Sequence, residues 1–88
     1  MISGTEMAKK WPHTAARVVL TPGINVRNAW SVLADAWGED DALHWVEHEA
    51  RKLAEAGDAE ARERVRRVLQ EVAPHLIGKS LLLSAPPA

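Results

Sequence analysis

The sequence of 88 residues contains no cysteine, and it has no long apolar run. Without cysteine the chain can form neither a disulfide bond nor a zinc site with thiolate ligands, which is compatible with a reducing cytoplasm. No apolar run approaches the roughly 18 residues that a membrane-spanning helix needs, and the first residues lack the apolar core of a signal peptide. We therefore expect a cytoplasmic, soluble protein that does not bind membranes.

Neither sign of charge dominates the sequence. Eleven basic and twelve acidic residues give a net charge of −1, so bulk charge makes no case for a binder of nucleic acid or of anionic membranes. The charges are unevenly distributed, because residues 1–28 are net basic whereas residues 29–56 carry seven acidic side chains against Arg51 and Lys52. We therefore expect a weakly basic amino-terminal region and an acidic middle region.

The usual catalytic signatures are also missing: there is no Ser-His-Asp elbow, no Gly-rich phosphate loop and no EF-hand spacing. One string, His44-Trp45-Val46-Glu47-His48, has the His-x-x-Glu-His order of inverted zinc proteases, in which two imidazoles one helical turn apart hold the metal. However, only 40 residues follow His48 to supply a third ligand, and the nearby Lys52 would repel a cation. We interpret the string as a solvated helix face, and we predict no metal, no cofactor and no enzymatic activity.

What the sequence does contain is a helical composition. Of its 88 residues, 47% are hydrophobic, and 15 of these are alanine, which favours closely packed helices over a thick β-sandwich. A chain of this length forms one domain with a modest core. Apolar residues recur with helical spacing in three segments: from Asn25 to Trp37, from Asp40 or Asp41 to about Ala56, and from Gly57-Asp58 to a kink or end at Pro74.

These segments predict an all-α fold in which a small three-helix bundle occupies residues 24–78. Residues 1–23 are expected to be an extended arm, with a short β-favouring run at Arg17-Val18-Val19-Leu20. Residues 79–88 are expected to form an apolar strap, Leu81 to Leu83, followed by a proline-rich tail. The arm and the strap could pair as a short two-stranded ribbon.

Several bulky apolar side chains fall outside the three predicted helical stripes, and water-exposed apolar surface of this size is costly. Either the arm and the strap fold back over Trp45, or these residues form an interface with a partner. The residues expected to bind a partner are Trp11, Trp45, Glu49, Leu81, Leu82 and Leu83. We predict a non-enzymatic protein-interaction module that is at least a dimer, and that acts as an inhibitor or adaptor through an apolar and acidic surface.

A small DNA-binding regulator is the alternative prediction. Arg62, Arg64, Arg66 and Arg67 lie close together in the last helical segment, and the arm adds Lys9, Lys10 and Arg17. The arginines alternate with glutamates and point to different sides of the predicted helix, which is typical of a solvated helix face. Binding of nucleic acid is therefore kept as an alternative that the sequence does not favour.

Three short motifs carry a resemblance to a family of small, uncharacterised bacterial helical proteins. They are Trp37-Gly38-Glu39-Asp40, Trp45-Val46 and Leu53-Ala54-Glu55-Ala56-Gly57-Asp58, and together they lie within residues 29–76. The chain departs from the family's pattern by an extra residue after Gly38, a long amino-terminal arm and an apolar tail. The resemblance implies a compact helical fold and a bacterial or phage origin, and it implies no known activity.

Overall fold

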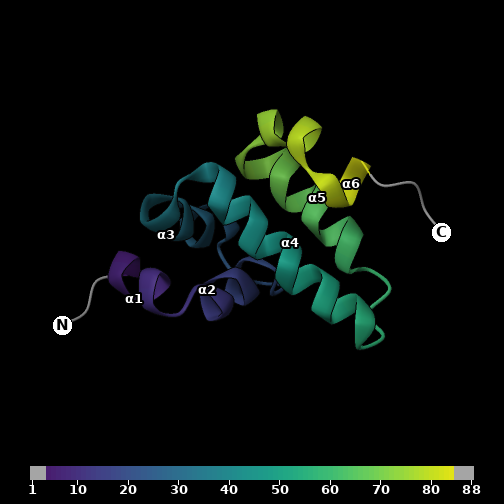
Figure 1. Cartoon of the computed structure of the whole chain (residues 1–88), viewed down its shortest axis with the longest axis horizontal. Helices are drawn as coiled ribbons and strands as arrows, with labels where there is room; N and C mark the ends of the chain where they lie inside the picture. Colours follow the sequence, from purple (N-terminus) through teal and green to yellow (C-terminus); the bar gives the residue numbers. More distant parts are fainter. Residues whose placement is uncertain (1–3, 85–88) are drawn as a thin grey trace.

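Three helices lie where the sequence predicts them. In a computed structural model, which describes residues 4–84, they are α3 (Val26–Trp37), α4 (Glu39–Glu55) and α5 (Ala61–Val72). Helix α4 crosses the middle of the molecule, with α3 on one side of it and α5 on the other (Figure 1). Helices account for 81% of the described residues, which confirms the all-α class.

The ends of these helices are set by specific residues. The Asn25 side chain accepts a hydrogen bond from the backbone N–H of Asn28 at 3.2 Å, which confirms that it caps α3. Gly38 alone separates α3 from α4, so the expected capping by Asp40 or Asp41 is wrong: both residues lie inside the first turn of α4. Pro74 ends α5 as expected and begins a 3₁₀ helix, η1 (Pro74–Lys79).

The predicted stripes of the three helices form the centre of the hydrophobic core. Trp30 and Leu33 of α3 and Val46 of α4 are all buried in one cluster, and α3 contacts α4. The further core residues on these helices are Ala42, Leu43, Ala50, Ala61, Val65, Val68 and Leu69. Helical spacing of apolar residues was therefore a sufficient signal for this part of the fold.

The amino-terminal region differs from the expected extended arm. Within residues 4–23 the chain forms two helices, α1 (Gly4–Lys10) and α2 (Pro12–Val19), and the run expected to be a strand closes α2. Residues 4–84 contain no β-strand, so the predicted ribbon is wrong. The predicted number of helices, three, is also too low. Besides α1 and α2, the helices η1 and α6 (Leu81–Ser84) follow α5.

Burial explains why residues 12–19 are helical despite their β-branched residues. Ala16 and Val19 lie one turn apart and are both fully buried against the core, a contact that an extended strand could not make with the same two residues. Pro12 occupies the first turn of α2, where its missing N–H costs no hydrogen bond. Tertiary packing therefore outweighs the β propensity of this segment.

Helices α1 and α2 cover one side of the bundle. Helix α1 packs on α3, where the indole N–H of Trp37 donates a hydrogen bond to the carbonyl of Ala8 at 3.0 Å. Helix α2 packs on both α3 and α4, and η1 and α6 lie on the opposite side of α4, beside α5 (Figure 1). None of the helices within residues 4–84 has both the length and the apolar character needed to cross a membrane.

We expect Gly38→Ala to lower the free energy of unfolding by about 1–3 kcal/mol, because φ 84° and ψ 158° lie in a region that essentially only glycine adopts. The matched control is Gly78→Ala. Gly78 lies in η1, its φ is not positive, and the space around an added Cβ would be open. This change should raise stability by about 0.4–1 kcal/mol or leave it unaltered. Urea unfolding followed by tryptophan fluorescence measures both, and equal stability of the two variants would contradict the strain at Gly38.

Candidate functional site

A buried carboxylate connects α2 to α4. Glu49 of α4 is only 3% exposed, and its Oε1 accepts a hydrogen bond from the Arg17 guanidinium at 2.8 Å. Its Oε2 accepts one from His13 Nδ1 at 3.1 Å and lies 3.5 Å from the Lys52 ammonium. Glu49 is therefore buried and engaged within its own chain.

Burial alone would raise the pKa of Glu49, but the surrounding donors and charges outweigh that effect. Hydrogen bonds from His13 and Arg17, together with the positive charges of Lys52 and Arg17, hold the pKa of this carboxyl below its ordinary value of 4.5. Glu49 is consequently ionised at neutral pH, and its ion pairs tie α2 to the centre of the molecule.

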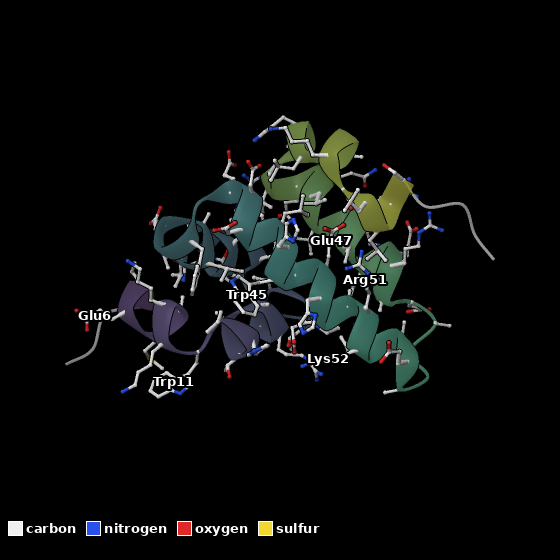
Figure 2. The ribbon with its side chains drawn as sticks, viewed as in Figure 1. Glu6, Trp11, Trp45, Glu47, Arg51 and Lys52 are labelled. Atoms are coloured by element: carbon white, nitrogen blue, oxygen red, sulfur yellow. The ribbon has the colours of Figure 1, made fainter. Side chains whose placement is uncertain are left out.

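Trp45 of α4 lies between aromatic side chains of two other helices, α2 and α3. Its ring centroid is 5.6 Å from that of Trp37 and 4.8 Å from that of His13, and both pairs meet edge to face. The side chain is half-buried, and in Figure 2 it lies over the ribbon, whereas Trp11 projects outward near the junction of α1 and α2. Of the two coverings considered for Trp45, the structure therefore contains the one supplied by the amino-terminal segment of the same chain.

The other buried carboxyl group holds the carboxy-terminal segment. Glu47 is 2% exposed, and its Oε2 accepts hydrogen bonds from the Ser80 hydroxyl at 2.6 Å and from the Leu82 N–H at 2.8 Å. Figure 2 shows Glu47 on the side of α4 near α5 and α6, away from Lys52. Leu82 and Leu83 are half-buried against the core, whereas Leu81 is 65% exposed. The proline-rich end of the expected tail, residues 85–88, lies outside the described residues.

The His-x-x-Glu-His string does not assemble as a metal site. Glu47 is buried and bonded to Ser80 and Leu82, whereas His44 and His48 are exposed. The structure instead brings a third residue, His13 of α2, close to His48 and Glu49, and ligand atoms of these three side chains lie within 4.8 Å of one another. No spacing in the sequence predicts this cluster, because His48 lies 35 positions after His13.

A groove lies between α1, α2 and α3, and apolar side chains make up most of its lining. Four of the five large apolar side chains that are exposed within residues 4–84 line it, each with an exposed fraction of 38 to 48%: Met7, Trp11, Val18 and Ile24. The groove has a volume of about 480 Å³, and its remaining lining consists of Gly4, Ala8, Thr14, Ala15, Asn25, Asn28, Ala29 and Val32. Of the expected partner-binding residues, only Trp11 lies here.

Met7, Val18 and Ile24 are not among the residues that were expected to bind a partner. Met7 and Val18 lie within residues 1–23, which were expected to be an extended arm. Had residues 12–19 been assigned to a helix, Trp11, Ala15 and Val18 would have fallen at helical spacing along one face, next to the buried face of Ala16 and Val19. The signal was therefore present, but it depended on the correct secondary structure.

The arginines of α5 form contacts within the chain. Arg64 pairs with Asp58 at 2.6 Å, which lowers the pKa of that carboxyl group, and Arg66 lies 3.4 Å from Glu63. Arg62 donates a hydrogen bond to the Leu83 carbonyl at 3.0 Å. These contacts occupy three of the four arginines on which the DNA-binding alternative depends.

We expect Glu49→Gln to reduce the acid sensitivity of the fold. Because the pKa of Glu49 is lowered in the folded state, its contribution to stability is complete above pH 4.5 and is lost as the pH falls through its folded-state pKa. The wild type should thus lose more stability than Glu49→Gln on acidification below pH 4.5, although the variant is less stable at pH 7. Urea unfolding across this pH range measures the difference, and parallel acid profiles would rule out the contribution of Glu49.

Comparison with known proteins finds no relative: no family model, no curated protein and no solved structure matches the chain. The resemblance to small bacterial helical proteins therefore stays a prediction from the three short motifs. The candidate sites rest on the geometry of this chain alone, and they are the apolar groove and the cluster around Glu49.

Proposed function

We propose that this chain is a non-enzymatic protein-association module that forms a homodimer through the groove between α1, α2 and α3. The proposal rests on four exposed apolar side chains that line one groove: Met7, Trp11, Val18 and Ile24. On most protein surfaces, exposed apolar residues are scattered singly. Tryptophan and methionine are enriched in the cores of protein interfaces. Full burial of such a side chain contributes about 1.5–3 kcal/mol, so covering the groove is favourable.

The absence of charge in the groove favours a second copy as its occupant. In a dimer with twofold symmetry the same patch of each subunit meets itself, so a patch of one charge sign would repel its own copy. Among the described residues that line the groove there is no aspartate, glutamate, lysine or arginine, and the polar members Thr14, Asn25 and Asn28 can both donate and accept hydrogen bonds. The lining is therefore compatible with its own copy.

The geometry also supplies an anchor for such an interface. Trp11 stands at the junction of α1 and α2, half-exposed beside the groove, with the Lys10 ammonium 5.0 Å from its ring centroid. An exposed indole next to an apolar concavity is the arrangement in which interface hot spots occur. In the proposed dimer each subunit inserts Trp11 into the groove of the other.

The test compares two aspartate substitutions that are matched in their surroundings. Ile24 precedes the residue that caps α3, and Leu81 is the first residue of α6. Both are exposed aliphatic residues, and an acidic side chain is well tolerated at the start of a helix. Light scattering at micromolar protein concentration should give a dimer mass for the wild type and for Leu81→Asp. Ile24→Asp should give the monomer mass with unchanged helical content, because its charge would be buried in the interface.

Two results would overturn this proposal. If the wild type stays monomeric at high protein concentration, the chain does not self-associate. If Ile24→Asp remains a dimer and Leu81→Asp becomes a monomer, the interface lies at the carboxy-terminal leucines and not at the groove.

A further inference from the structure

We propose a second, independent site: a zinc-binding site formed by His13 of α2 with His48 and Glu49 of α4. Two imidazoles and one carboxylate are a donor set that zinc accepts in proteins, with a water molecule completing a tetrahedral coordination. The three side chains offer ligand atoms within 4.8 Å of one another. None of them lines the apolar groove, so this site does not rest on the proposed dimer.

Two of the three ligands are already at coordination spacing. Ligand atoms of a tetrahedral zinc ion are about 3.3 Å apart, given zinc–ligand distances of about 2.0–2.1 Å. His13 Nδ1 and Glu49 Oε2 are separated by 3.1 Å. His48 is exposed, its ring lies 5.7 Å from that of His13, and its ligand atom lies within 4.8 Å of those of His13 and Glu49.

The buried carboxylate is fixed before a metal arrives. The hydrogen bond from Arg17 to Oε1 orients the Glu49 carboxylate and leaves Oε2 directed toward His13. Partners of this kind, which hold a ligand without touching the metal, are a regular part of protein metal sites.

Nearby positive charge limits the affinity of the site. Lys52 lies 3.5 Å from Oε2, the atom that zinc would take, and Arg17 adds a second positive charge. The Lys52 side chain is half-exposed and can swing into solvent, whereas Arg17 keeps its bond to Oε1. The site therefore binds zinc more weakly than it would without Lys52, which gives a substitution that is expected to improve binding.

The competing interpretation is a pair of histidines on α4 alone. His44 and His48 are one turn apart, so they could hold a metal without any contribution from α2. The two sites share His48 but differ in their other ligands, because Glu47 is bonded to Ser80 and Leu82 and is not free to join His44. His13→Ala and His44→Ala therefore separate the two sites.

Titration calorimetry with zinc chloride at neutral pH tests the proposal on the full chain. Wild type should bind one zinc per chain, and zinc should raise its unfolding temperature, because the metal joins α2 to α4 only in the folded state. His13→Ala and His48→Ala should each weaken binding by about tenfold or more, which is what loss of even an outer-shell partner costs. His44→Ala should bind as the wild type does, and Lys52→Gln should bind more tightly.

Two results would overturn the proposal. Loss of binding in His44→Ala with full binding in His13→Ala would place the metal on α4 alone and overturn the proposal. So would the absence of saturable binding by the wild type in a large molar excess of zinc. His48 is exposed, but its ring lies 6.4 Å from that of Trp45, so circular dichroism of each variant distinguishes a loss of binding from a loss of fold.

Discussion

Helix α4 buries two carboxyl groups on opposite faces, and the rest of the molecule is arranged to satisfy them. Glu47 and Glu49 are two residues apart, which places their side chains about 200° apart around the helix. A buried carboxylate is tolerable only when hydrogen bonds or opposite charges replace its water. Arg17 and His13 do this for Glu49, whereas Ser80 and the Leu82 N–H do it for Glu47.

Each buried glutamate thus receives its partners from a different end of the chain. The donors to Glu49 come from α2, and the donors to Glu47 are Ser80, between η1 and α6, and Leu82 of α6. Loss of either contact would leave a desolvated acidic group in the core, which is more costly than loss of a surface ion pair. The central helix thereby fixes where both terminal segments pack, even though neither belongs to the central trio of helices.

The packing of the amino-terminal segment covers some apolar residues of the central helices and leaves other apolar residues exposed. The amino-terminal segment covers Trp45 and Trp37, which the trio α3, α4 and α5 would leave open. Helices α1 and α2 are too short to bury all their own apolar residues, so the outward face that they share with α3 becomes the groove. Covering one exposed tryptophan therefore exposes another, Trp11, at a new position.

The sequence predicted the parts of the fold that depend on local periodicity. Stripes such as Ala61, Val65, Val68 and Leu69 repeat over three turns, and the Asn25 cap and Pro74 stop have local physical causes. Helices α1 and α2 were missed because seven or eight residues contain too few repeats, and because the valines of α2 favour a strand on their own.

The candidate sites were harder to predict than the core. The contact of His13 with Glu49 spans 36 residues, and nothing in the sequence marks one residue as the partner of the other. The acidic residues 47 and 49 were expected at the surface because carboxylates are rarely buried without a visible partner. Their partners became visible only when the terminal segments were placed on α4.

The single-residue connection at Gly38 has a consequence for how this chain can vary. With one residue between α3 and α4, two backbone dihedral angles set the angle between these helices and keep Trp37 against Trp45. An inserted residue would release that angle, whereas the exposed turn of residues 21–24 could lengthen at the small entropic cost of a longer loop. Insertions and deletions in related chains should therefore gather between α2 and α3, and the junction of α3 with α4 should keep a constant length.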